Sequence, residues 1–279
     1  MGEFLAALSS LIYGTSDFLG GVASKRNDGV VVTFFSQACG FAALLVAVAL
    51  WPDVTVTGSD LWWGIAGGVS GGLGLMFFYP ALAVGPMSVV APTTALCSAS
   101  VPLVVGLLLG ERPHPVALVG VLLALPAIVL VARERHDHPV HARRSTVVSA
   151  VIAGFGFGGF FVLLSRADSA SGLWPLVGAR IGSLSMLVVV LLVTRRPWRI
   201  ARGTWRTVVS AGVGDVTANG LYLLAVGRGL LSVVAVIGSM YPASTVILAR
   251  FVLHERLQRV QIVGLLLALA SLGLVALGR

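Results

Sequence analysis

The chain has 279 residues, of which 57% are hydrophobic and only 11% are charged. Soluble domains carry about 25% charged residues, so the composition excludes that class. The net charge of +8 is typical of Lys and Arg gathered at one face of a membrane, and no nucleic-acid partner is predicted. Cys39 and Cys97 lie in apolar runs and are predicted to be unpaired core residues.

Ten apolar runs are predicted to be membrane-spanning helices, each long enough to cross a hydrocarbon layer of roughly 30 Å. Breakers such as Gly, Pro, Asn and Asp separate the runs. In chain order the runs cover residues 3–23, 30–51, 61–84, 88–109, 115–132, 146–164, 172–193, 207–226, 232–252 and 259–278. The short loops leave no room for a soluble catalytic domain, so the chain is not predicted to be an enzyme.

Two stretches of the chain, 88–125 and 232–269, agree without gaps at 16 of 38 positions. A period of about half the chain indicates one duplicated unit. The sequence therefore divides into a first repeat at 1–133, a charged linker at 134–145 and a second repeat at 146–279. Each repeat holds five spans, and because five is odd the second repeat must be inverted relative to the first. The predicted fold is an all-α integral membrane protein with ten transmembrane helices as two inverted five-helix repeats.

The basic residues predict the orientation in the membrane. Of the 19 Lys and Arg residues, fourteen fall in the loops after spans one, three, five, seven and nine, and four fall on the opposite side. By the positive-inside rule the first set of loops is cytoplasmic and both termini lie outside. The linker also contains His136, His138 and His141, but its Arg-rich sequence favours a solvated segment over a metal site. No metal and no cofactor is predicted.

Glycines at a spacing of four predict helices that pack closely in lipid. Three of them lie on the third span and two on the sixth, namely Gly64, Gly68, Gly72, Gly154 and Gly158. Residues 154, 156 and 159 also match G-x-G-x-x-G, a pattern that binds dinucleotides when it follows a β-strand. The match lies inside a membrane run, so helix packing is the favoured interpretation.

Ionisable residues within the spans are rare. Asp17 and Asp215 are the two of the eleven acidic residues that lie well inside a span, and Arg180 is the comparable base. Each costs roughly 2.5–3.5 kcal/mol near a helix centre, so such residues usually face a cavity and mark substrate or proton paths. A structural ion pair with Arg180 is the alternative. We predict that Asp17, and after it Asp215, carries a coupling proton, with Arg180 as an anion anchor or as a group that tunes the carboxylates.

Helical spacing places further polar and aromatic side chains beside these groups. Tyr13 is one turn from Asp17, and Asn219 is one turn from Asp215. The predicted substrate contacts are Tyr13, Gln37, Thr94, Arg180, Asn219, Tyr222 and Tyr241. Such a set suits an amphipathic or cationic ligand, and core packing is the alternative for any single tyrosine.

Glu111 and Glu255 stand where the fourth and ninth spans end. A helix C-terminus disfavours an anion. Each carboxylate is therefore expected to bond a basic neighbour or the free N–H groups of the next helix, and we predict structural or gate-edge roles for both.

These features resemble the EamA-domain branch of the drug/metabolite transporter (DMT) superfamily. The resemblance rests on five plus five spans, a Gly–aromatic signature in the first span, a polar residue early in the second span of each half, and the two Glu–Arg pairs. The residues concerned are Lys25, Gln37, Arg180, Glu111, Glu255, Gly120 and Gly264. The resemblance implies a basket of ten helices around a central cavity, alternating access and export of amino acids, metabolites or drugs. Many relatives have cytoplasmic termini, whereas the basic loops here predict the reverse.

Residues and resemblance together predict a secondary transporter of the bacterial inner membrane that exports a small metabolite, amino acid or drug, with protons as the coupling partner. Its expected partners are the small-molecule substrate and the lipid bilayer, and it is expected to be a monomer or a homodimer. The first alternative is a uniporter or importer of an organic cation or amino acid on the same fold. The second is a membrane scaffold or sensor without transport, for which the linker would be the partner surface.

Overall fold

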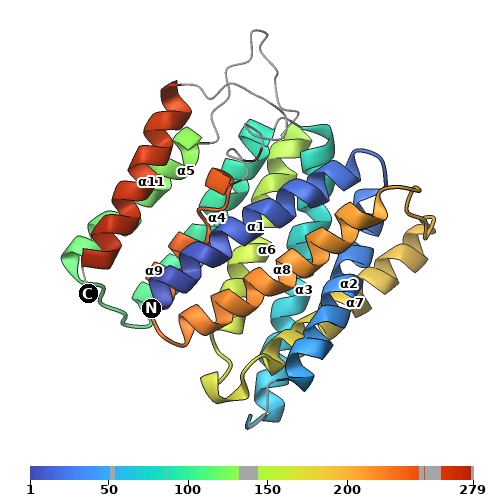
Figure 1. Ribbon diagram of the computed structural model, residues 1–279, viewed down its shortest axis with the longest axis horizontal. Coiled ribbons are helices and arrows are strands. Elements are labelled where there is room, and N and C mark those ends of the chain that lie inside the picture. The colour runs from blue at the N-terminus through green and yellow to red at the C-terminus, as the bar shows by residue number, and fades with distance from the viewer. Residues whose placement is uncertain (51–53, 86, 132–143, 245–247, 249–258, 278–279) are drawn as a thin grey trace.

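The computed structural model describes residues 1–50, 54–85, 87–131, 144–244, 248 and 259–277. These residues form ten α-helices and one short 3₁₀ helix, with no strand among them, which confirms the predicted all-α fold. In chain order the α-helices are α1 (Gly2–Ser24), α2 (Gly29–Ala49), α3 (Gly58–Val84), α4 (Met87–Leu108), α5 (Pro115–Val131), α6 (Arg144–Leu164), α7 (Trp174–Thr194), α8 (Trp205–Val226), α9 (Leu231–Gly238) and α11 (Arg259–Leu277) (Figure 1). The predicted linker lies outside the described residues up to its last two positions, which already belong to α6.

Five of the described helices, α2, α3, α6, α7 and α8, are long and apolar enough to cross a membrane by length and composition. Their most apolar stretches have a mean hydropathy between 1.3 and 2.3. A 21-residue helix such as α2 is about 32 Å long at 1.5 Å per residue, which matches the hydrocarbon layer. Shorter apolar stretches occur in α4, α5, α11 and the segment that begins with α9.

Contacts between loops show that the two repeats are inverted. The loop before α2 meets the loop before α8, where the Ala201 N–H donates to Asn27 Oδ1 at 2.7 Å. At the other end of the helices, the start of α3 meets the loop before α7, where the Asp168 N–H donates to Asp60 Oδ1 at 2.9 Å. The loops before α2 and α7 have equivalent places in the two repeats but lie at opposite ends. We call these ends the Asp28 end and the Asp60 end.

Each end is organised by a carboxylate at a helix N-terminus. Asp28 precedes α2, accepts the Val30 N–H at 2.9 Å and also forms an ion pair with Arg196. Asp60 lies in the first turn of α3 and accepts the N–H and the hydroxyl of Thr57 at 3.0 and 2.7 Å. A carboxylate satisfies the free N–H groups of a helix start and opposes the helix dipole. The same side chains therefore start a helix and join two loops.

Glycines let the two repeats pack backbone to backbone. A Cβ on Gly64 of α3 would lie 2.1 Å from the Pro175 carbonyl oxygen of α7, and one on Gly212 of α8 would lie 1.9 Å from the Ser36 carbonyl oxygen of α2. Between α6 and α4, a Cβ on Gly154 would lie 2.6 Å from a carbonyl oxygen of α4. Side chains larger than hydrogen would force these helices apart. The predicted close packing is confirmed for Gly64, Gly68, Gly72, Gly154 and Gly158.

The ninth predicted span is interrupted. It begins as α9, which has eight residues, passes through a turn at 239–241 and becomes helical again at Pro242. Proline has no N–H, so Pro242 cannot donate to the carbonyl four residues before it, and the helix breaks there. Interrupted membrane helices often border binding sites because their free backbone groups need a lined cavity.

The helices fall into a central group and an edge pair. Helices α5 and α11 pack side by side at one edge (Figure 1), where Ser271 Oγ donates to the Gly120 carbonyl at 2.7 Å. Helices α1, α2, α3, α6, α7 and α8 surround the middle of the molecule. The site is built from this central group.

Candidate substrate site

A cavity lies between the six central helices, and Tyr241 also lines it. It encloses about 50 Å³, which is room for a few water molecules at roughly 10–15 Å³ each. Tyr13 is the twelfth of the 23 residues of α1, and Asp215 is the eleventh of the 22 residues of α8. The cavity is therefore near the middle of the helices, at the depth where an ionisable side chain is most costly in lipid.

An ion pair between α7 and α8 forms the polar wall of the cavity. Arg180 Nη2 donates to Asp215 Oδ2 at 2.7 Å, and the two side chains are 5% and 11% exposed. Gln37 of α2 joins both partners, because its Oε1 accepts from Arg180 Nη1 and its Nε2 donates to Asp215 Oδ2 at 3.2 Å. Ser183 Oγ also donates to Gln37 Oε1, at 3.1 Å. The predicted alternative of a structural ion pair with Arg180 is thus realised with Asp215.

The network continues to α1. Asn219 lies one turn after Asp215 and donates from Nδ2 to Asp215 Oδ2 at 3.1 Å. Its other amide atom, Oδ1, accepts the hydroxyl of Tyr13. One carboxylate oxygen of Asp215 therefore accepts hydrogen bonds from side chains of α2, α7 and α8. A buried charge is stable only when it is paired and hydrogen-bonded in this way.

Asp17 faces the same cavity without such partners. Its side chain is buried, with 7% of the residue exposed, and it lines the cavity one turn along α1 from Tyr13. Its carboxylate makes no hydrogen bond or ion pair to any residue that the structure describes. An ionised carboxylate in such a place needs a counter-charge, or it takes up a proton.

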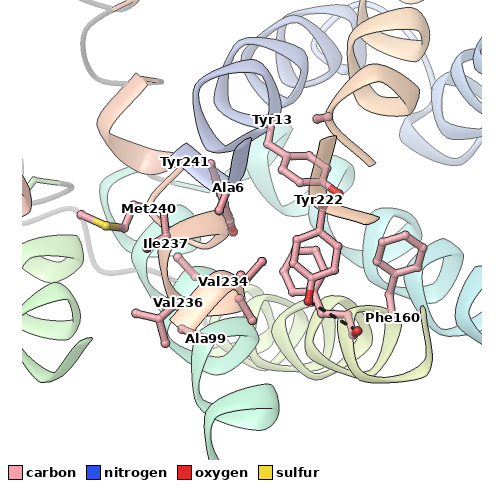
Figure 2. Close-up of a cluster of buried hydrophobic side chains, with 14 of the residues drawn as sticks. Ala6, Tyr13, Ala99, Phe160, Tyr222, Val234, Val236, Ile237, Met240 and Tyr241 are labelled. Carbon is pink, nitrogen blue, oxygen red and sulfur yellow. Dashed lines mark hydrogen bonds between the residues drawn. The ribbon is translucent and has the colours of Figure 1, made fainter. Parts of the chain in front are cut away.

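Aromatic and aliphatic side chains make up much of the rest of the lining. The lining residues of this kind are Leu75, Phe157, Phe160, Phe161, Leu176 and Tyr241. Tyr13 meets Phe161 edge to face with 6.1 Å between ring centroids. In Figure 2 the rings of Tyr13, Tyr222 and Phe160 lie on one side of the hydrophobic cluster, and Val234, Ile237 and Met240 lie on the other. The site thus combines aromatic rings with the carboxylate of Asp17 and a polar network around the Arg180–Asp215 pair.

The sequence profile of the EamA-like transporter family matches the chain twice, over residues 1–133 and 144–277. The chain belongs to the EamA-like transporter family. No curated protein matches it closely enough to be informative. One solved structure, described only as the crystal structure of a protein, superimposes with a TM-score of 0.80 at 16% identity and covers 100% of this chain and 97% of its own. That likeness shows that this EamA-like chain shares its fold.

Two predicted substrate contacts of this EamA-like transporter lie away from the cavity. Thr94 is fully buried between α4 and α6, where its hydroxyl donates to the Ala150 carbonyl at 3.0 Å. Tyr222 stacks on Phe161 with 4.3 Å between ring centroids, and its hydroxyl donates to the Phe161 carbonyl at 3.4 Å (Figure 2). Both residues bond to backbone carbonyls of α6 and so join that helix to its neighbours, and neither is among the residues that line the cavity.

Glu111 bonds a helix from the other repeat. Its two carboxylate oxygens accept the Leu231 and Ser232 N–H groups at 2.8 and 2.9 Å, at the start of α9. Gly110 has a φ of +88°, a conformation that glycine adopts readily, and this turn folds Glu111 back over the end of α4. The expected bond to free helix N–H groups is present, but the helix is α9 and not the next one in the chain. Glu255 lies outside the described residues.

Several lining residues carry no sequence signal of their own. The three phenylalanines of α6 and the leucines at 75 and 176 resemble any apolar residue of a membrane helix. Gly68 and Gly72 were expected only as packing residues, yet they also line the cavity. Ser183 was the one polar omission that spacing could have found, because it lies three residues after Arg180 on the same helix face.

Proposed function

We propose that this EamA-like membrane transporter exports a small molecule by alternating access and that Asp17 carries the proton that drives it. The observation that supports the proposal most strongly is a buried carboxylate without a partner among the described residues, at the centre of an inverted repeat. Asp215, the second candidate for the coupling proton, is already paired with Arg180 at 2.7 Å. Asp17 is therefore the better candidate.

The inverted repeats supply the two conformations. When two inverted halves exchange their conformations, a site between them that opened to one side of the membrane opens to the other. The present cavity holds about 50 Å³, far below the roughly 300–1,000 Å³ of a small-molecule site. Binding therefore requires the central helices to separate at the Asp28 end or the Asp60 end.

The unpaired carboxylate supplies the coupling. In a site shielded from water, the ionised form of Asp17 is costly unless a positive charge lies beside it. The proton and a bound substrate compete for this place, so substrate release on one side favours proton uptake there. An inward proton gradient then drives export.

The basic residues support the orientation with the Asp28 end in the cytoplasm. In the described loops at this end stand Lys25, Arg26, Arg195, Arg196, Arg199 and Arg202, and basic loops stay on the cytoplasmic side. The proposed location is the bacterial inner membrane, with both termini outside. We also propose that the linker 134–145 separates the two repeats and that the protein is a monomer or a homodimer.

The test uses a ligand found by a thermal-shift screen of the purified protein against amino acids, metabolites and drugs. Uptake of that ligand into proteoliposomes is then measured with and without a pH gradient, for the native protein and for Asp17→Asn. We expect the gradient to accelerate uptake several-fold and the variant to lose this acceleration. Full pH-driven transport by Asp17→Asn would remove the coupling assignment. Flux that follows only the ligand gradient in the native protein would identify a uniporter, and loss of function on deletion of residues 136–142 would favour a scaffold.

A further inference from the structure

We infer that the transported substrate is a monovalent organic cation with an apolar, aromatic-sized body, and that it exchanges one for one with the proton on Asp17. The inference rests on the proposed transport function and adds the class of substrate to it. It follows from the charges that the cavity holds, from the partners of each polar group and from the aromatic rings in the lining.

The first step is the charge of the cavity. Its lining includes three residues whose side chains can carry a charge near neutral pH, namely Asp17, Arg180 and Asp215. Arg180 and Asp215 cancel each other across 2.7 Å. With Asp17 ionised the cavity has a net charge of −1, and with Asp17 protonated it is neutral. The species that completes the ionised form is a monocation.

The second step argues against an anion held by Arg180, which is one of the two roles that the sequence predicts for this residue. Both terminal nitrogens of the guanidinium are engaged, Nη1 with Gln37 and Nη2 with Asp215, whereas the buried Nε has no hydrogen-bond partner among the described residues. An anionic substrate would add a second negative charge to the cavity. A zwitterion would leave the charge of Asp17 uncompensated. Uncompensated buried charge costs several kcal/mol, so both classes are disfavoured.

The third step concerns polar ligands without charge. The amide groups of Gln37 and Asn219 and the hydroxyls of Tyr13 and Ser183 bond to one another or to the ion pair. A sugar or another ligand rich in hydroxyls would have to break these bonds to find partners. The lining also includes the rings of Phe157, Phe160, Phe161 and Tyr241, and the face of an aromatic ring attracts a cation by up to about 2 kcal/mol when water is excluded.

The fourth step is the identity of the titrating group. The ionisable side chains around Asp17 are Tyr13 on its own helix, Asp215 on α8, Arg180 on α7, Tyr79 on α3, and Tyr241. The described parts of α2, α9 and α11 bring no acidic or basic side chain to the cavity. Tyrosine is neutral near pH 7, and the Arg180–Asp215 pair has no net charge. Asp17 is the group that exchanges its proton for the cation.

The test measures binding and proton release together, on the purified protein in weakly buffered detergent solution with a pH indicator. The probe is benzyltrimethylammonium, whose charge does not depend on pH, so any released proton comes from the protein. We expect one proton to be released per bound cation, and an affinity that falls about tenfold per pH unit on the acid side of the Asp17 titration. L-Phenylalanine and phenylacetate present the same ring with a zwitterionic and an anionic group, and we expect both to bind about tenfold or more weakly.

Variants on α1 separate charge from packing. Asp17→Asn keeps the shape of the side chain and should lose both cation binding and proton release, whereas Asp17→Glu should retain proton release. Thr15→Ala changes the exposed face of the same helix and should behave as the native protein. Thermal unfolding of each variant shows whether it is folded. Cation binding without proton release, or equal binding by folded Asp17→Asn, overturns the inference.

Flux in proteoliposomes separates this inference from the proposed function. Exchange of one monocation for one proton moves no net charge, so flux of the probe should follow a pH gradient and ignore a membrane potential set with potassium and valinomycin. Gradient-driven flux of phenylacetate or phenylalanine but not of the cation would keep the transporter and overturn the cation assignment. Binding of the cation with proton release but without any flux would keep the assignment and overturn transport.

Discussion

The Arg180–Asp215 pair offers a quantitative test of the site, because the chain also contains a matched pair at its surface. The buried partners are 5% and 11% exposed, whereas Arg196 and Asp28 are 39% and 30% exposed. Removing one partner of a buried pair leaves the other charge unpaired, which costs about 3–5 kcal/mol. Exposed pairs contribute about 0–1 kcal/mol. Arg180→Gln should therefore destabilise the protein several kcal/mol more than Arg196→Gln does.

The double variant Arg180→Gln/Asp215→Asn completes the experiment. It removes both charges and leaves neutral side chains that can still bond to Gln37 and Asn219. The remaining loss is that of weakened hydrogen bonds, about 1–3 kcal/mol in total. The double variant should therefore be more stable than either single variant, and the sum of the two single losses should exceed the double loss by several kcal/mol. Asp28 is left unchanged in the control, because it also caps α2 through the Val30 N–H.

The free energy of unfolding is measured by titrating each variant in mixed micelles with sodium dodecyl sulfate and following circular dichroism. Two results would refute the reasoning. If Arg180→Gln and Arg196→Gln cost the same, the central site is as wet as the surface. If the double variant loses as much as the two single variants together, the charges do not depend on each other.

Three further predictions concern packing and local bonds. Gly64→Ala pushes α3 away from α7, because its Cβ would lie 2.1 Å from a carbonyl oxygen, and should cost about 1–3 kcal/mol of stability. Gly67→Ala, whose Cβ would have its nearest neighbour 3.6 Å away, should be neutral or gain up to about 1 kcal/mol from helix propensity. Equal losses of the two variants in the same unfolding assay would contradict the packing argument. Glu111→Gln weakens the bonds to the two amides at the start of α9 and should speed their hydrogen exchange, with unchanged exchange as the contrary result. Tyr13→Phe leaves Asn219 Oδ1 without its donor and should cost about 1–3 kcal/mol of stability. Tyr222→Phe should cost less, because the hydrogen bond that it removes is 3.4 Å long. The reverse order of the two losses would refute the proposed network.

The architecture could be predicted because it depends on features that are read directly from the sequence. Apolar run length gives the helices, the odd number of spans in each half gives the inversion, and small residues at a spacing of four give the close contacts at Gly64 and Gly154. The polar residues within apolar runs led to most of the polar residues that line the cavity. Asp17, Arg180, Asp215, Gln37 and Asn219 all line it, because lipid tolerates such side chains only when they face the interior.

The remaining features depend on which helices become neighbours, and a membrane sequence says little about that. Lipid and protein core are both apolar, so the residues around Thr94 and Tyr222 do not differ in polarity from one helix face to the other. The sequence therefore does not show which neighbouring helix these two side chains contact. The choice of Asp215 over Asp17 as the partner of Arg180 depends on how α7 and α8 lie beside each other. The bond from Glu111 to Leu231 joins residues 120 positions apart, a pairing that helical spacing alone does not reach.

Different interactions hold the loops together at the two ends of the molecule, an ion pair at the Asp28 end and a hydrogen bond to a backbone amide at the Asp60 end. At one end Arg196 and Asp28 attract each other in partial contact with solvent, where dissolved ions weaken charge interactions over a Debye length of about 8 Å at physiological ionic strength. At the other, the Asp168 N–H donates to the carboxylate of Asp60, a residue that is 2% exposed. Concentrated salt therefore weakens the Arg196–Asp28 ion pair more than it weakens the bond to Asp60, because buried groups are screened less than exposed ones. Under the proposed alternating access, the ionic strength of the medium at the Asp28 end would bias which end of the central helices separates first.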